Sequence, residues 1–187
     1  MRWSMALLLL SGVAVGVGAE HLERRRVLQP PAPMPAQALP VDAATQALVE
    51  TLDHKGIRLA HNSGQCKHAA ILGFHTAGSG WIDLCTDAIQ QAASGTSAYK
   101  ALLQQVLAHE AVHVAQYCRR SRGGQPSVGL PDHQLADLSA ADKQSVERAV
   151  SRGTHRLPYE QAWRQEAEAT ALERQPATVV ALLNSAC

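Results

Sequence analysis

Residues 109–113 read His-Glu-Ala-Val-His, an HExxH pattern whose residue types and spacing suit metal binding. Residues four apart lie on one face of a helix, about one turn from each other, so the imidazoles of His109 and His113 can reach a single metal ion. Glu110 points to an adjacent helical face, where its carboxylate can act on a water molecule. We therefore interpret the pattern as a candidate zinc site with Glu110 as the general base.

The motif lies in a segment, residues 97–118, that contains neither Gly nor Pro and carries apolar residues on both sides of the two histidines. This pattern predicts one long buried helix. The alternative is a helix whose His and Glu side chains simply lie at the solvent boundary and bind no metal.

A third ligand is needed, because a catalytic zinc site has three protein ligands and a water. The sequence from Pro158 onward predicts a second helix, since proline is tolerated in a first helical turn, and it carries Glu166 and Glu168. These two residues are roughly 200° apart around a helix, so only one of them can face the metal. We expect the third ligand to be Glu166, with Glu168 as its rival.

The HExxH pattern at 109–113 followed by Glu-Ala-Glu-Ala-Thr at 166–170 resembles the gluzincin clan of zinc metallopeptidases. Several families of this clan carry HExxH on one helix and E-x-x-A-[DN] on a later one. The resemblance implies that His109, His113 and Glu166 bind Zn²⁺, that Glu110 is the general base, and that the substrate is a peptide or protein. It covers these two helical segments only.

The resemblance has one departure, because Thr170 replaces the Asp or Asn that often orients a ligand from behind in these families. The metzincin pattern is excluded, since it requires Gly and His where this chain has Gln116 and Arg119. A donor for the negative oxygen formed during peptide hydrolysis is also expected. Candidates are His155 and Tyr159, just before the second helix, whereas Tyr117 is interpreted as helix packing.

The first 19 residues predict a cleavable signal peptide. Arg2 precedes an apolar stretch too short for an ordinary membrane span, and small residues at 17 and 19 suit cleavage after Ala19. We therefore expect a secreted or periplasmic protein with no stable membrane span after cleavage. An uncleaved anchor is the alternative.

Residues 20–40 contain five prolines, which favours an extended linker or tail over a packed structure. A pro-segment that shields the site until it is removed is the second interpretation. Without residues 1–19, the 16 basic residues that remain (17 less Arg2) balance 16 acidic residues. Zero net charge argues against nucleic acid as a partner.

Four cysteines lie in the exported part, and an even number in an oxidising compartment favours two disulfides. Cys66 and Cys85 bracket a predicted hairpin, while a bond from Cys118 to Cys187 would tie the C-terminus to the end of the motif helix. We prefer these pairings among the three possible connectivities.

The remaining pattern predicts a small α+β domain of zincin type over residues 41–187, mainly helical with one short β-hairpin or small sheet. Helices are expected at 41–54, 139–153 and 176–187, and strands at 69–76 and 81–85 around the glycine-rich turn at 77–80. An exposed strand beside a zinc site can bind an extended peptide as an added strand. Alternatively, the hairpin only covers the core.

These features predict an exported zinc-dependent metallopeptidase that hydrolyses peptide bonds. A zinc-binding but non-catalytic interaction module is the alternative, and a disulfide-bonded helical protein without metal is the third interpretation. The nature of the substrate does not follow from the sequence.

Overall fold

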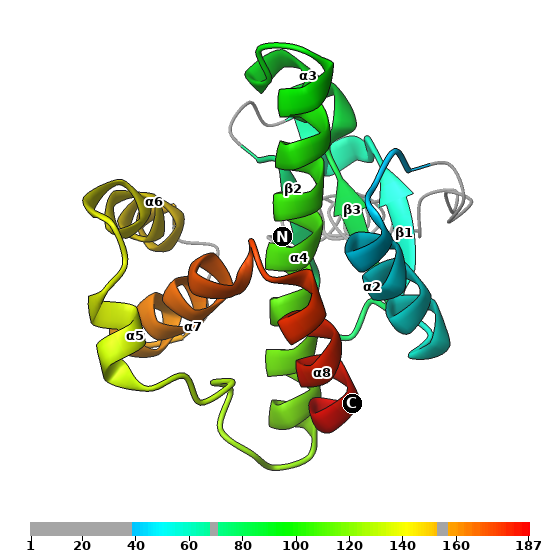
Figure 1. The fold of residues 1–187 in the computed structure, drawn as a ribbon. Helices are drawn as coiled ribbons and strands as arrows, with labels where there is room; N and C mark the ends of the chain where they lie inside the picture. Colours follow the sequence, from blue (N-terminus) through cyan, green and yellow to red (C-terminus); the bar gives the residue numbers. More distant parts are fainter. Residues whose placement is uncertain (1–38, 68–70, 153–156) are drawn as a thin grey trace, which may run out of the picture. The chain divides into compact units, whose positions relative to one another are not determined.

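The computed structural model describes residues 39–67, 71–152 and 157–187 (Figure 1). Within these ranges the chain is mainly helical and has a single three-stranded sheet, which confirms the predicted α+β class. The predicted signal peptide, nearly all of the Pro-rich segment and His155 lie outside the described residues.

The first described helix, α2 (Ala43–His54), begins within two residues of its predicted start. Asp42 caps it, because its side-chain Oδ1 accepts a hydrogen bond from the backbone N–H of Thr45 at 2.8 Å. Gly56 follows the helix with φ of 75°, a left-handed conformation that glycine adopts without strain, so the chain can turn into the sheet.

The sheet contains β1 (Arg58–His61), β2 (Gly73–His75) and β3 (Trp81–Leu84) in the order β1-β3-β2. The predicted hairpin is confirmed, because β2 pairs antiparallel with β3. The parallel pairing of β1 with β3 was not predicted, since four residues are too few to show a clear alternation. β2 therefore lies at one edge of the sheet.

Two helices follow the sheet. The short α3 (Thr86–Ala92) was not predicted, and α4 (Thr96–Ser121) is the long motif helix. Its buried residues lie on most sides of the helix between positions 103 and 116 and include Leu103, Leu107 and Val114, each fully buried. In Figure 1, α4 runs through the centre of the domain, with the sheet on one side of it.

The C-terminal half contains four helices: α5 (Asp132–Ala136), α6 (Ala140–Ser151), α7 (Tyr159–Leu172) and α8 (Pro176–Ala186). Of these, α5 was not predicted. Ser139 caps α6, because its Oγ accepts a hydrogen bond from the backbone N–H of Asp142 at 3.1 Å.

The buried residues form two apolar clusters. The large cluster joins α2, the sheet, α4 and α8, whereas the small cluster joins α5, α6 and α7 around Leu135, Val146 and Ala162. α7 belongs to both, because Ala169 and Leu172 lie in the large cluster. This helix therefore connects the two clusters, and it is the helix that carries Glu166.

Both predicted disulfides are present, Cys66–Cys85 and Cys118–Cys187. The second joins α4 to the end of α8, which also packs along α2 and α4. In the described part of the chain, no helix is both long enough and apolar enough to cross a bilayer.

Candidate metal centre

Three side chains converge between α4 and α7. His109 Nε2 and His113 Nε2 lie 3.3 Å apart. Glu166 Oε2 lies 3.4 Å from the first nitrogen, and Glu166 Oε1 lies 3.5 Å from the second. One ligand atom from each residue lies within 4.8 Å of the others, and no other group of this kind is found among the described residues. The two histidines come from successive turns of one helix face, and the carboxylate comes from the facing helix.

The spacing of these atoms suits a tetrahedral zinc ion. Zinc lies about 2.0–2.1 Å from imidazole nitrogens and carboxylate oxygens, so two tetrahedral ligand atoms are about 3.4 Å apart. The separations of 3.3, 3.4 and 3.5 Å are close to this value, and the two that involve Glu166 are made by its two different carboxylate oxygens. Two neutral imidazoles and one carboxylate also form a donor set that is used in catalytic zinc sites, where a fourth position stays open to water.

The outward-facing nitrogen of His109 is held by a carboxylate that sequence reasoning missed. Nδ1 lies 3.1 Å from Glu173 Oε2, and the other oxygen of Glu173 accepts a hydrogen bond from Gln105. A carboxylate acceptor keeps the proton on Nδ1 and leaves the Nε2 lone pair for a metal. Glu173 thus holds His109 from behind, which is the role that the sequence comparison would have given to an Asp or Asn at position 170.

The outward-facing nitrogen of His113 is held by Gln116, which sequence reasoning also missed. Gln116 Oε1 lies 2.8 Å from His113 Nδ1, while its amide nitrogen donates to Gln165 O at 3.0 Å and to Glu168 at 3.2 Å. Because the amide nitrogen faces two acceptors, the oxygen must accept from the Nδ1–H of His113. This bond selects the tautomer whose Nε2 can bind a metal.

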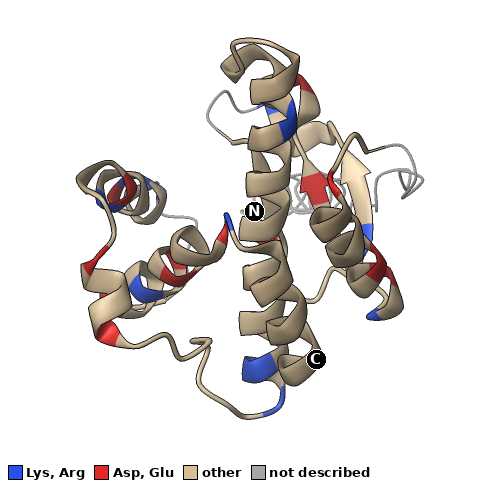
Figure 2. Ribbon diagram, viewed as in Figure 1, with Lys and Arg blue, Asp and Glu red and all other residues tan. Residues whose placement is uncertain are grey.

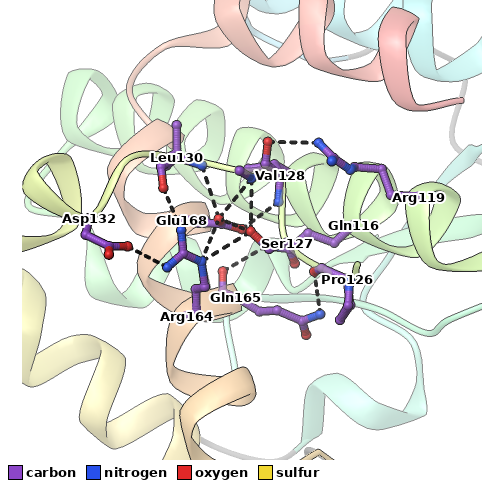
Figure 3. Close-up of polar contacts among 11 residues, drawn as sticks. Gln116, Arg119, Pro126, Ser127, Val128, Leu130, Asp132, Arg164, Gln165 and Glu168 are labelled. Atoms are coloured by element: carbon purple, nitrogen blue, oxygen red, sulfur yellow. Dashed lines mark hydrogen bonds and ion pairs between the residues drawn. The ribbon is translucent and has the colours of Figure 1, made fainter. Parts of the chain in front are cut away.

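Glu168, the rival ligand, points away from the two histidines and is fully buried. Its carboxylate accepts hydrogen bonds from the Ser127 hydroxyl and from three successive backbone N–H groups, those of Val128, Gly129 and Leu130 (Figure 3). The side chain therefore anchors the loop between α4 and α5. This role explains a buried charge without a metal, because its acceptor sites are occupied.

Arg164 makes a second set of polar contacts with the same loop. Its guanidinium lies 3.4 Å from Glu168, donates to Leu130 O at 2.6 Å, and pairs with Asp132 at 2.7 Å (Figure 3). A chain of contacts thus runs from His113 through Gln116 to Glu168 and the loop. The position of the second histidine depends on residues well outside the HExxH motif.

Glu110 lies on the side of α4 that faces β2. It is 7 % exposed, and its carboxylate receives a backbone hydrogen bond from His75. Gly73 permits this close approach, since a Cβ at that position would lie 2.6 Å from Val106 Cγ1 and 3.3 Å from Glu110 Cγ. Only glycine fits between the strand and the helix here.

Burial and nearby charges shift two pKa values in this centre. Burial raises the pKa of Glu110, and the imidazoles of His113 and His109 act in the opposite direction. Burial lowers the pKa of His109, but the hydrogen bonds that its ring donates to the Glu166 and Glu173 carboxylates outweigh that effect and raise the pKa to about 10. The centre is therefore an anionic environment that favours a cation.

No basic side chain of α4 competes for these carboxylates. Between Lys100 and Arg119 the helix carries neither Lys nor Arg, and Figure 2 shows the basic residues of α4 only toward its two ends. On this part of α4, therefore, only the histidines can supply positive charge to the carboxylates of the centre. This distribution suits a site that binds an exchangeable cation.

The predicted oxyanion donor Tyr159 is not brought to the metal centre. It is 54 % exposed, and its hydroxyl donates to Glu147 of α6 at 2.5 Å. Tyr117, interpreted from the sequence as helix packing, is instead 37 % exposed, and its ring lies 6.1 Å from that of His75. The sequence could not distinguish these two tyrosines, because both have helical spacing to a ligand.

A model of the family described as "Domain of unknown function (DUF8637)" matches residues 38–187, most of the chain. The chain belongs to this family. No curated protein and no solved structure matches it. The interpretation of this DUF8637 chain therefore depends on its own residues and geometry.

Proposed function

We propose that this DUF8637 chain is an exported zinc-dependent metallopeptidase of gluzincin type. The observation that carries the proposal is the convergence of His109, His113 and Glu166: the two Nε2 atoms lie 3.3 Å apart, and each lies 3.4 or 3.5 Å from one oxygen of the Glu166 carboxylate, close to the value of about 3.4 Å between ligand atoms of a tetrahedral zinc site. Glu110, the neighbour of the first ligand, supplies a buried carboxylate beside the same centre.

Each residue then has a chemical role. A zinc ion held by the three ligands supplies Lewis acidity, which acidifies water and polarises a carbonyl group. Glu110 accepts the proton of the attacking water and returns it to the leaving amine. Burial raises the pKa of Glu110, which makes its carboxylate a stronger base than one on the surface. Glu173 and Gln116 hold the two imidazoles in the tautomer that binds metal.

β2 pairs with no strand on its outer side within the described residues, and this edge supports a peptide as the substrate. Cys85 N donates to Leu72 O, and paired residues of an antiparallel ladder alternate between bonded and unbonded pairs. By this alternation Phe74 bonds to β3, while the backbone groups of Gly73 and His75 face outward, toward Glu110. An extended peptide that pairs with this edge would bring a backbone carbonyl next to the general base.

The two disulfides fit an oxidising compartment, which supports export. The apolar N-terminal 19 residues would supply the signal for it. We accordingly propose a secreted or periplasmic location.

Zinc content is the first test, measured on the full chain expressed in an oxidising compartment so that both disulfides form. We expect one zinc per chain, and a Glu166→Ala variant should lose it. Glu160→Ala is the matched control, because Glu160 lies on the same helix but is exposed. Absence of zinc from the wild-type chain would refute the proposal.

Catalysis is tested separately with a Glu110→Gln variant and a library of unstructured peptides. The variant should keep its zinc and lose hydrolysis by roughly 10²-fold or more. If the wild-type chain binds zinc and cleaves none of the peptides, the non-catalytic interaction module is the better interpretation. Equal hydrolysis by the variant would exclude Glu110 as the base.

A further inference from the structure

Two polar side chains beside the metal centre have no role in the chemistry described above. Tyr117 follows His113 by one turn of α4, so it lies on the same helix face as the two histidine ligands. His75 is the last residue of β2 and the register partner of buried Ile82, so its imidazole lies on the same sheet face as Ile82.

These two side chains meet each other across the gap between strand and helix. Their rings lie 6.1 Å apart in an edge-on arrangement. The Tyr117 hydroxyl lies only 2.9 Å from the point that a Cβ of residue 78 would occupy, and Gly78 has φ of 76°. The turn between β2 and β3 therefore needs glycine at this position so that the tyrosine can lie against it.

Neither side chain is engaged elsewhere. Within the described ranges, no hydrogen bond or ion pair involves the Tyr117 hydroxyl or a ring nitrogen of His75, whereas the hydroxyl of Tyr159 is held by Glu147. Tyr117 as a whole is 37 % exposed. The domain thus presents two uncommitted donors, an imidazole N–H and a phenolic O–H, beside the same histidine ligand.

We propose that His75 and Tyr117 are catalytic residues that stabilise the negative oxygen formed during peptide hydrolysis, an inference that rests on the proposed peptidase function. When the water oxygen bonds to the carbonyl carbon, the carbonyl π electrons move to its oxygen, and the two donors form hydrogen bonds to that charge. The C–N bond then breaks, the C=O double bond re-forms, and the amine receives its proton from Glu110. His75 and Tyr117 transfer no proton in this sequence.

The proposal replaces the donors expected from the sequence with a pair on the β2 side of the centre. It also gives the edge strand two uses, because the backbone of His75 orients Glu110 while its side chain faces the reacting carbonyl. An extended peptide paired with β2 would lie next to both groups. The strand and the HExxH helix would together form the catalytic surface.

The test uses Tyr117→Phe, His75→Leu and the conservative His75→Gln in the zinc-loaded full chain. Tyr117→Phe and His75→Leu should each lower kcat by roughly 10²-fold with little change in KM, because a donor to the transition state is lost. His75→Gln retains an N–H donor and should recover part of the rate. Zinc content and thermal stability should be unchanged, and Tyr99→Phe and His61→Gln serve as matched controls.

A binding measurement separates this inference from the proposed function. The probes are an N-phosphoryl-leucine peptide, whose tetrahedral anion resembles the reacting carbonyl, and acetohydroxamate, which requires only the metal. Tyr117→Phe and His75→Leu should weaken the first probe by about tenfold or more and leave the second unchanged. Equal affinity of wild type and variants for the phosphoryl probe, or unchanged kcat, would overturn the assignment. Absence of turnover in the wild type would refute the peptidase function, and the phosphoryl probe would still decide whether the two donors bind such an anion.

Discussion

His109 Nδ1 and Glu173 Oε2 lie 3.1 Å apart, and this contact joins the first histidine of the HExxH motif to the last turn of the facing helix. Glu173 follows Glu166 by seven residues, or about two helical turns, so both carboxylates project toward α4 from one face of α7. Glu166 lies beside the Nε2 atoms of both histidines, and Glu173 holds the Nδ1 side of the His109 ring.

The Glu173 carboxylate should raise zinc affinity without touching the ion. We expect Glu173→Ala to weaken zinc binding by roughly 10–100-fold, because His109 loses the acceptor that selects its tautomer. Competition with a chromogenic chelator measures the dissociation constant. Glu160→Ala is the control, since Glu160 is an exposed carboxylate on the same helix. Equal affinities of the Glu173 variant and the wild type would exclude this role.

Gln116 should couple zinc affinity to the stability of the fold. Gln116→Met removes the acceptor of His113 Nδ1 and both donors to α7 while keeping a similar volume. We expect weaker zinc binding together with a lower unfolding temperature, measured by chelator competition and by calorimetry. The exposed Gln161→Met should change neither quantity. Loss of stability with unchanged zinc affinity would show that His113 is positioned by other contacts.

Substitution of Glu166 should affect zinc binding, whereas substitution of Glu168 should affect the stability of the fold. Glu166→Ala should abolish zinc binding, whereas Glu168→Ala should lower the free energy of unfolding of the metal-free chain by on the order of 3 kcal/mol, because buried N–H groups of the loop lose their acceptor. Urea unfolding in the presence of EDTA measures the second effect. Direct loss of zinc from a still-folded Glu168→Ala protein would contradict the assignment of roles.

Gly73 should be required by the fold for a steric reason that a second mutation can relieve. Gly73→Ala would place a methyl group 2.6 Å from Val106 Cγ1, and we expect a loss of about 1–3 kcal/mol in stability. In the Val106→Ala background the clashing methyl is absent, so the same substitution should cost less. A double-mutant cycle by urea unfolding measures this coupling. If the effects of the two substitutions on stability are additive, the strain does not come from contact with Val106.

The cap at the start of α2 should make part of the stability depend on acidity. The backbone hydrogen bond from Thr45 holds the pKa of Asp42 below its ordinary value of 3.8. Because the folded-state pKa is the lower one, this stabilisation is present above pH 3.8 and is lost as the pH falls through the folded-state value. Asp42→Ala should cost about 1 kcal/mol at pH 7 and less below pH 4, while Asp53→Ala, on the exposed side of the helix, should show no such difference. Thermal unfolding across this pH range measures both.

The sequence predicted the groups whose relative position is set by local geometry. A four-residue spacing on a helix places His109 beside His113 whatever the rest of the fold does, and the hairpin with its Cys66–Cys85 disulfide follows from a similarly local pattern. The Cys118–Cys187 disulfide spans 69 residues and was a choice among three connectivities. The fold class and most helix bounds were therefore accessible without a structure. The short elements β1, α3 and α5 were not, because they carry too few residues to show a period.

The partners of the ligands could not be predicted, because they depend on how α4 and α7 cross. No sequence pattern places Glu173 on His109 or aims Gln116 at both His113 and Glu168. The same applies to His75, which reaches the centre only through the β2 register and the absence of a side chain at Gly73. A spacing of seven from Glu166 was the one available signal for Glu173.

The three residues of the candidate metal centre lie on helices from different apolar clusters, so a bound ion would link the two clusters. His109 and His113 belong to the helix of the large cluster, while Glu166 belongs to the helix shared with the small one. An ion bound by all three residues would be a reversible cross-link between α4 and α7. A substrate that shifts α5, α6 and α7 relative to α4 would change the distances among the three ligands and so the affinity for the ion. Removal of the ion would allow the same movement.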